Sequence, residues 1–434
     1  MNRRRFWIAL FVFSLVGQIA WVVENMYFNV FIYHMFNASQ GNIALMVQAS
    51  AVAATLTTLL IGALSDRLGK RRSFITVGYL LWGISILVFA ALRVDWIETL
   101  FPSTAQNTAK AASIGVSLVI AFDCLMTFFG STANDACFNA WLTDSTNESN
   151  RGKAEGVNAM MPLLAILVVF GGTMWAEKDN ATHWTILFLM IGAIVLVTGI
   201  LGFFLIDETN KKERPKDRYV QTLFYGFRPS VIRDNPDLYL TLLGFTIFGI
   251  SIQVFMPYLI LYYTEGLHLN NYVMIMAPAI VLAAIATAFY GRAYDRIGYR
   301  KSLIPPLVVL LIGYAALFLS RHVALVFIGS LLMMCGYLCG MTVFGARIRD
   351  CTPDGMAGRF QVLRIIGQVL IPGVIGPEIG KRVLAGANVI QNDDGTFSFI
   401  PNANIFLWAG IVLLPISILI AIEVFRYRKA IRHA

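Results

Sequence analysis

The sequence has little charge for its length. Only 14% of its 434 residues are Asp, Glu, Lys or Arg, whereas 57% are hydrophobic. A water-soluble domain usually has about 25% charged residues, because charge keeps its surface hydrated. The shortage of charge therefore argues against an ordinary soluble protein and indicates that much of the outer surface faces lipid.

The sequence also lacks the residue patterns of common catalytic and metal sites. Its five cysteines and five histidines show no metal-ligand spacing, and no disulfide framework is predicted. Gly69-Lys70 lacks the glycine spacing of a phosphate-binding loop, and no serine lies in a nucleophile elbow. We therefore expect no enzyme, no cofactor and no metal.

Long apolar runs are abundant. A helix needs roughly 18 or more apolar residues to cross the hydrocarbon layer, and these runs are too long and too uniform for barrel strands. We predict an all-α membrane protein with twelve transmembrane helices in two pseudo-symmetric six-helix bundles. The predicted spans are 7–33, 42–63, 73–93, 111–142, 155–176, 184–206, 238–263, 271–291, 303–320, 323–346, 360–384 and 404–425.

The two groups of six spans define the domain organisation. Residues 1–206 form the predicted N-terminal bundle, 207–237 a polar and basic cytoplasmic linker, and 238–434 the C-terminal bundle. Basic loops are retained in the cytoplasm, and with both termini inside only six of the 34 Lys and Arg residues fall in outer loops. We expect a multi-pass protein of the plasma or inner membrane, and the basic loops account for the net charge of +9 without nucleic acid.

One loop pattern occurs twice. Gly62-Ala-Leu-Ser-Asp66-Arg67-Leu-Gly69-Lys70-Arg71 follows the second span, and Gly291-Arg292-Ala-Tyr-Asp295-Arg296-Ile-Gly298-Tyr-Arg300 follows the eighth. Both copies resemble the inner-loop motif of the major facilitator superfamily, which implies two halves that rock around a central site. We expect Asp66, Arg67, Asp295 and Arg296 to latch the inner side, although a basic inner loop alone would also satisfy the charge rule.

A finer resemblance points to a substrate class. The run from Asn134-Asp135 to Asp144, with Asn150-Arg151-Gly152, resembles the glycoside–pentoside–hexuronide:cation symporters, the family of melibiose permease. This resemblance implies cation-driven sugar uptake. The acids of the sodium-using members are replaced by Ala54 and Thr58 in the second span, and Gln18 stands where a sugar-binding Asp is found, so a proton is favoured over sodium.

Ionisable residues within the spans mark the expected site. They cost several kcal/mol at membrane depth and therefore usually line a pathway or form buried pairs. The acids are Glu24, Asp123 and Asp135, and the base is Arg364. We predict that the three acids couple transport to a cation, because a buried carboxylic acid can hold a proton near neutral pH. The alternative for Asp135 is a fixed pair with Arg364 or Arg151.

The first span is the most polar. Trp21, Glu24, Asn25 and Phe28 have helical spacing for one face, with Gln18 nearby. An aromatic ring beside carboxylate and amide groups suits a sugar, although interhelical hydrogen bonding is the alternative. In the fourth span, Asp123 and Asp135 lie about 18 Å apart along a helix, which is too far for one shared site.

Other polar residues complete the predicted substrate site. Arg364 has Gln368 one turn away and is expected to grip substrate hydroxyls, unless it snorkels to the interface. The weaker candidates, each of which could equally pack between helices, are Asn158, Gln253 and Tyr258.

The sequence predicts a monomeric secondary transporter that imports a mono- or oligosaccharide by cation symport, with H⁺ favoured over Na⁺. An exporter of drugs or metabolites on the same fold is one alternative, although the polar first span argues against it. A membrane sensor without transport activity is another, but such a protein should have lost the buried acids.

Overall fold

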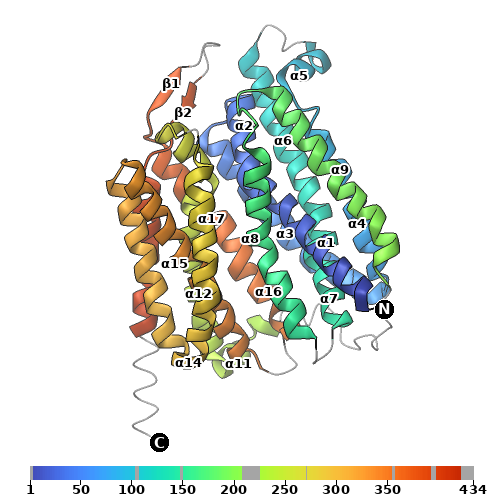
Figure 1. Cartoon of the computed structure of the whole chain (residues 1–434), viewed down its shortest axis with the longest axis vertical. Coiled ribbons are helices and arrows are strands. Elements are labelled where there is room, and N and C mark those ends of the chain that lie inside the picture. Colours follow the sequence, from blue (N-terminus) through green and yellow to red (C-terminus); the bar gives the residue numbers. More distant parts are fainter. Residues whose placement is uncertain are drawn as a thin grey trace, which may run out of the picture. The chain divides into compact units, whose positions relative to one another are not determined.

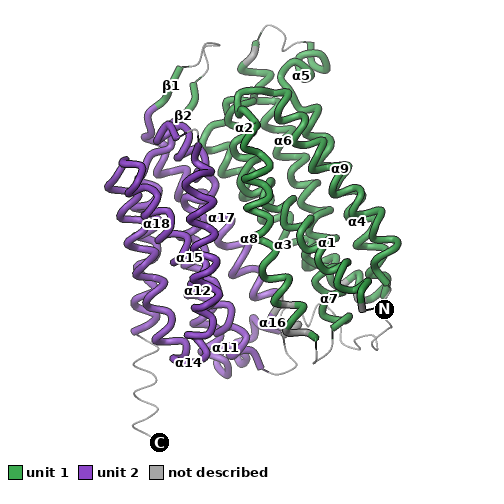
Figure 2. Tube along the Cα trace, viewed as in Figure 1, with its two compact units in different colours: residues 1–216, 389–399 green, residues 217–388, 400–434 purple. Residues whose placement is uncertain are grey.

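The structure is a computed structural model of the whole chain. It describes residues 3–102, 107–146, 150–207, 225–269, 271–353, 357–391 and 397–421. Nearly all of the described chain is helical (Figure 1). The contacts divide it into two compact units, residues 1–216 with 389–399, and residues 217–388 with 400–434 (Figure 2).

Unit 1 consists of helices that vary in their local winding. They are α1 (Arg3–Val22), η1 (Val23–Tyr27), α2 (Phe28–Phe36), α3 (Gln40–Leu68), α4 (Arg71–Phe89), α5 (Val94–Leu100), α6 (Thr108–Gly130), η3 (Ser131–Phe138), α7 (Asn139–Ser145), α8 (Arg151–Thr173) and α9 (Ala181–Leu205). Side-chain oxygens of Ser39, Asn107 and Asn180 cap α3, α6 and α9, since each accepts a hydrogen bond from a backbone N–H of the first turn.

Unit 2 repeats this plan. Its helices are η4 (Tyr225–Phe227), α11 (Pro229–Asp234), α12 (Pro236–Phe255), η5 (Met256–Tyr258), α13 (Leu259–Leu261), η6 (Tyr262–Gly266), α14 (Val273–Leu319), α15 (Val323–Cys351), α16 (Ala357–Ile365), η7 (Ile366–Leu370), α17 (Ile371–Leu384) and α18 (Asn404–Leu413). The short helices η4 and α11 lie within the predicted linker 207–237, most of which is outside the described residues.

Eleven helices of the described chain are long and apolar enough to cross a membrane. The longest, α14, is broken at Gly298, whose φ of 73° and ψ of 169° are not helical. Its two parts, 273–297 and 299–319, are each as long as the roughly 20 residues that a span needs. Counting both parts gives twelve spanning helices, as the hydropathy pattern predicts.

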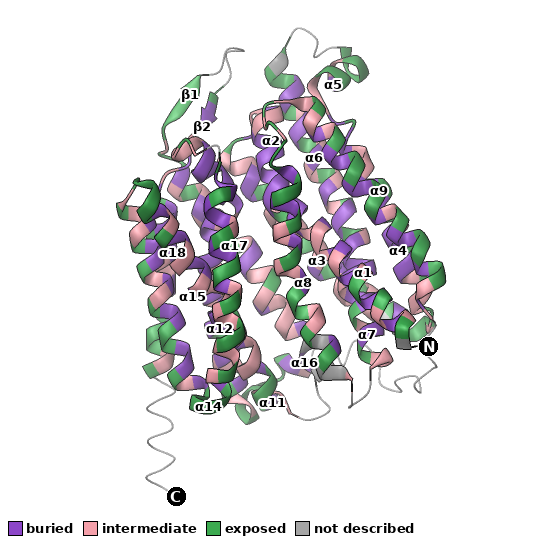
Figure 3. Ribbon diagram, in the orientation of Figure 1, coloured by how far each residue is buried: buried purple, intermediate pink, exposed green. Residues whose placement is uncertain are grey.

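Many large apolar residues of these helices are exposed, in addition to those that are buried in the core. Exposed residues, green in Figure 3, occur along most of the helices. Leu60, Phe204 and Leu319 are 63%, 67% and 77% exposed. In water such a surface would drive aggregation, whereas hydrocarbon solvates it. The exterior therefore fits a lipid environment.

A short hairpin interrupts the outer loop between α17 and α18. Strands β1 (Val389–Gln391) and β2 (Phe397–Phe399) pair antiparallel, with Val389 opposite Phe399. The hairpin packs in unit 1, where the Tyr33 hydroxyl donates a 2.7 Å hydrogen bond to the Phe399 carbonyl. Residues 385–403 fall between two predicted spans, and the hairpin within them was not predicted from the sequence.

Candidate functional site

Two buried carboxyl groups in unit 1 are joined by hydroxyl groups. Thr127 of α6 donates a 2.7 Å hydrogen bond to Oε1 of Glu24 in η1, and Ser50 of α3 donates to Oδ2 of Asp123. The Thr127 and Ser50 hydroxyls are 3.5 Å apart. Glu24, Thr127, Ser50 and Asp123 therefore form a continuous polar chain that connects three helices. We call these four residues the carboxyl chain.

No basic side chain of the described residues forms an ion pair with the carboxyl chain. Oε2 of Glu24 and Oδ1 of Asp123 are buried without a hydrogen-bond partner among the described residues. Within the same residues neither acid forms an ion pair, and the two are close enough to repel each other when both are charged. An isolated buried charge is costly, so the arrangement favours a proton on at least one carboxyl group.

Asp135 lies on the same helical stretch as Asp123 but outside the carboxyl chain. Its Oδ2 accepts a 3.0 Å hydrogen bond from the Ser131 hydroxyl. The Trp21 indole lies beside it and packs against Trp82, with ring centroids 5.1 Å apart. The indole N–H of Trp21 is buried and makes no hydrogen bond to the described residues. A polar donor therefore lies next to an aromatic face and to this carboxyl group.

Several site residues lie on π-helical segments. Glu24 and Asn25 are in η1, Asp135 is in η3, and Gln368 is in η7. A π-turn widens the helix and replaces i→i+4 hydrogen bonds by i→i+5 bonds, and such turns occur frequently at functional sites. The predicted polar residues therefore lie where the backbone departs from a regular α-helix.

The aromatic residues of the first span pack against α4. The Trp21 ring contacts Trp82, and the Phe28 ring contacts Phe89, seven residues further along α4, as well as Phe188. Phe28 is 1% exposed, whereas Asn25 is exposed and its side-chain amide donates to the Trp21 carbonyl. Trp21 and Phe28 therefore contact the same side of α4, and Phe28 lies in an aromatic cluster.

Glycines let the helices of unit 1 approach η3 closely. A Cβ on Gly17 would lie 2.2 Å from Nδ2 of Asn134, and one on Gly78 would lie 2.7 Å from Cβ of Ala133. The Asn134 amide donates a 2.7 Å hydrogen bond to the Tyr79 hydroxyl, which donates in turn to the Phe13 carbonyl. This contact fixes α1, α4 and η3 around the half-buried Gln18, Trp21 and Asp135.

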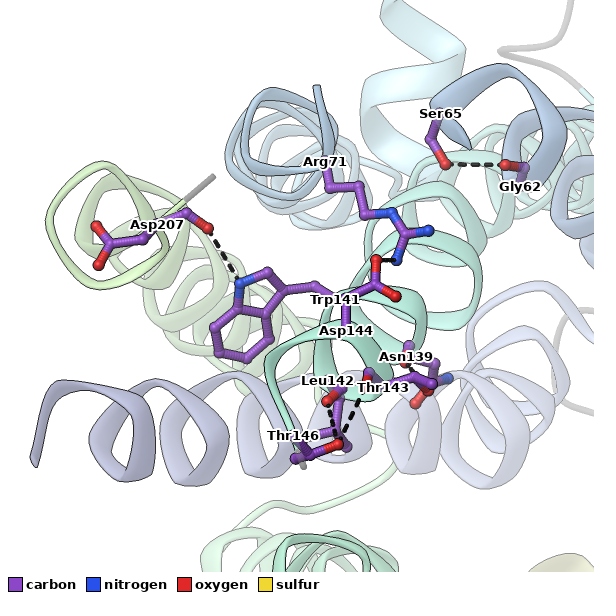
Figure 4. A network of polar contacts seen from close by, with 10 residues as sticks. All are labelled: Gly62, Ser65, Arg71, Asn139, Trp141, Leu142, Thr143, Asp144, Thr146 and Asp207. Carbon is purple, nitrogen blue, oxygen red and sulfur yellow. Dashed lines mark hydrogen bonds and ion pairs between the residues drawn. The ribbon is translucent and has the colours of Figure 1, made fainter. Parts of the chain in front are cut away.

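Ion pairs hold the ends of the helices at the duplicated loop. Arg71, at the start of α4, pairs with Asp144 of α7, and the neighbouring Trp141 indole donates a 3.2 Å hydrogen bond to the Asp207 carbonyl (Figure 4). In unit 2, the Tyr294 hydroxyl donates to Asp350 at the end of α15. The equivalent helix end in each unit thus presents an Asp to the loop motif.

The predicted latch residues themselves lie mostly on the surface. Arg67, Asp295 and Arg296 are exposed, whereas the Asp66 side chain lies outside the described residues. The contacts of Arg71 and Tyr294 described above lie at the same loops.

Comparisons with known proteins identify the fold family. The sequence profile of the Major Facilitator Superfamily matches residues 3–377. The chain belongs to this superfamily. It is a multi-pass membrane transporter rather than an enzyme, and the fold class predicted from the sequence is confirmed.

Solved transporter structures of the superfamily share the fold at low identity. A bacterial homologue of the human lysosomal transporter Spinster, in its inward-facing and occupied conformation, is 14% identical with a TM-score of 0.69, and 97% of each chain is covered. The nucleoside transporter NupG is 11% identical with a TM-score of 0.67, covering 97% of this chain and 99% of its own. A D-xylose-proton symporter is 14% identical with a TM-score of 0.66, covering 95% and 97%.

These similarities establish the fold alone, because all identities are far below 25%. No curated protein sequence matches the chain significantly. The closer relationship to glycoside–pentoside–hexuronide:cation symporters therefore stays a prediction from the sequence.

The remaining predicted residues of this superfamily member are distributed over both units. In unit 1, Asn158 accepts a hydrogen bond from Ser14. In unit 2, Tyr258 is fully buried and packs against Gly380, while Gln253 packs against Gly376. Arg364 and Gln368 are half-buried, and Nε of Arg364 has no hydrogen-bond partner among the described residues.

Sequence analysis did not identify the hydroxyl residues Ser50, Thr127 and Ser131. A signal for two of them exists, because Asp123, Thr127, Ser131 and Asp135 occur at every fourth position. Residues four apart lie on one side of a helix, so this polar stripe predicts a common face. Asp123 and Asp135, although about 18 Å apart along the helix, are therefore expected on the same face.

Proposed function

We propose that this transporter imports a mono- or oligosaccharide together with a proton by alternating access. The observation that carries the proposal is the carboxyl chain, in which two buried acids are connected through neighbouring hydroxyl groups and form no ion pair with the described residues. Such a pair can bind one proton and release it when the cavity opens to water. Similarity in fold to a D-xylose-proton symporter is consistent with this role.

The sugar would occupy the neighbouring polar and aromatic surface. The Trp21 ring offers a face for stacking, and its N–H lies beside the Asp135 carboxylate. Gln18, Asn25 and Asp135 offer hydrogen bonds to hydroxyl groups. Five further residues are proposed to contact the sugar: Asn158 in unit 1, and Gln253, Tyr258, Arg364 and Gln368 in unit 2. We propose that the protein works as a monomer in the cell membrane with both termini in the cytoplasm.

The direct test is uptake into proteoliposomes with a panel of labelled sugars under an imposed pH or sodium gradient. We expect an inward proton gradient to drive accumulation and a sodium gradient to have little effect. Glu24→Gln and Asp123→Asn should lose accumulation by at least tenfold while retaining sugar exchange at equilibrium, because only the coupling step needs the acid.

A matched control is Asp95→Asn, which removes an exposed acid of unit 1 that pairs with Arg93. This variant should accumulate sugar like the unaltered protein. If no sugar accumulates and none is displaced in a binding assay, the substrate class is wrong. If the sodium gradient alone drives uptake, the proposal that a proton is the coupling ion is wrong.

A further inference from the structure

Unit 2 has an apolar groove of about 290 Å³ on its surface. One wall belongs to the second part of α14, and the other belongs to α18 and the helical residues after it. The lining residues are Ile304, Leu307, Val308, Leu311, Leu413, Leu414, Ile416, Ser417 and Ile420. The volume is just below the roughly 300–1,000 Å³ of pockets that hold small ligands.

Both walls of the groove contain prolines, and the helix of one wall is interrupted. Proline has no backbone N–H and clashes with the preceding helical turn. The helix of α18 ends at Leu413 and resumes at Pro415, and Pro305 and Pro306 lie in the facing stretch. The Ser417 hydroxyl, the one polar side chain in the lining, donates a 2.6 Å hydrogen bond to the Leu414 carbonyl and is thereby satisfied locally. The groove therefore offers an occupant only apolar contact.

The groove lies at membrane depth. Both walls belong to spanning helices, and Ile304, Val308 and Leu414 are about half exposed, at 48%, 47% and 56%. At this depth the protein is surrounded by lipid acyl chains, so an acyl chain is the apolar group that can enter the groove.

One end of the groove carries a positive charge. Lys301 is exposed and forms no ion pair within the described chain. It precedes Ile304, Val308 and Leu311 by three, seven and ten residues, which places all four on one face of the helix. Lys301 follows the Gly298 break, in the loop that the proposed orientation places at the cytoplasmic surface. A phosphate group at the level of the lipid headgroups would meet this ammonium group.

We propose that this groove is a binding site for an anionic glycerophospholipid of the leaflet on the Lys301 side. One acyl chain lies between the two proline-containing walls, and the phosphate pairs with Lys301. Basic pockets between spanning helices bind anionic headgroups in the same way. The site is in unit 2 and does not depend on the proposed sugar or proton.

Native mass spectrometry of the purified full-length protein in detergent tests the site. Phosphatidylglycerol is titrated in parallel with phosphatidylethanolamine of the same acyl chains. We expect one tight phosphatidylglycerol per protein. Val308→Trp, which fills the groove, should weaken it at least tenfold, and Lys301→Gln should weaken it three- to tenfold and remove the preference for phosphatidylglycerol.

Two matched controls separate the site from general effects. Ile312→Trp adds the same ring at an exposed position beside the groove, and Lys153→Gln removes an exposed lysine of unit 1. Both should bind within twofold of the unaltered protein. The proposal is overturned if Val308→Trp binds normally, if both lipids bind equally, or if a dimer that Val308→Trp abolishes shows that a second copy covers the groove.

Discussion

Gly69 and Gly298 occupy the same position in the two copies of the loop motif, and both have a positive φ, of 62° and 73°. Their ψ angles differ, at 26° and 169°, so only Gly69 is left-handed helical. A Cβ at either position would meet no atom within 4 Å, so space is not the constraint. The common feature is the positive φ, which residues with a side chain rarely adopt.

Substituting either glycine by alanine should strain the loop. We expect Gly69→Ala and Gly298→Ala each to destabilise the protein by about 1–2 kcal/mol, the usual cost of a positive φ for a residue with a Cβ. Thermal unfolding of the purified variants measures this. Gly62→Ala and Gly291→Ala change the first glycine of each copy, which has open space and no positive φ, and should leave stability unchanged or slightly raised.

Thr127→Val should disturb the carboxyl chain while preserving shape. Oε1 of Glu24 would lose its hydrogen bond in a buried setting, which costs about 1–3 kcal/mol. We expect a lower melting temperature and impaired proton-driven uptake. Thr127→Ser keeps the hydroxyl and should restore most of the uptake, and equal loss in both variants would contradict the role assigned to the hydroxyl.

Gly17→Ala should separate α1 from η3. Its Cβ would fall 2.2 Å from the Asn134 amide and 2.8 Å from the Tyr79 hydroxyl, so the hydrogen bond between those two groups must shift. We expect a loss of about 1–3 kcal/mol, as for other overpacked interiors. Gly171→Ala, in the open space of α8, is the control and should be tolerated.

The pair of Arg71 and Asp144 should contribute measurably to stability, because both side chains are largely shielded, with exposures of 15% and 23%. A double-mutant cycle with Arg71→Gln and Asp144→Asn is expected to give a coupling energy of about 1 kcal/mol. A value near zero would show that the contact is incidental.

Asp179 provides a pH-dependent contribution at the opposite end of unit 1. Nδ1 of His34 donates a 2.7 Å hydrogen bond to its carboxylate, and this bond holds the pKa of Asp179 below its usual value. Because the pKa of Asp179 is lower in the folded protein than the value of about 3.9 in the unfolded chain, its ionised form stabilises the fold at pH values above about 3.9. This stabilisation is lost as the pH falls through the pKa of the folded state. We expect Asp179→Asn to lower the melting temperature at neutral pH but not below about pH 3. Glu177→Gln, which changes an exposed acid of the same loop, should show no such dependence.

The spanning helices could be predicted because hydrocarbon imposes length and composition on each of them. Even the break between the eighth and ninth spans follows from the charged loop around Gly298. The β1–β2 hairpin and α5 could not be predicted, because each is only a few residues long and the hairpin depends on contacts such as that of Phe399 with Tyr33.

The acids of the candidate site could be identified because charge in a span is an anomaly. Their hydroxyl partners carry no such signal, since Ser and Thr in spans often bond to their own helix, as Thr55 does to the Ala51 carbonyl. The π-turns could not be predicted either, because no residue type is specific to the position where a helical turn widens.

Among the residues that the structure describes, no counter-charge pairs with Glu24 or Asp123, and this has an electrical consequence for the proposed cycle. With a proton bound, one negative charge is neutralised, so the loaded carrier feels the membrane voltage less than the empty one. A voltage that is negative inside would then act mainly on the empty carrier and push its charge outward, by up to about 2.3 kcal/mol for one charge across 100 mV. The voltage would thus accelerate the return step rather than the entry of sugar.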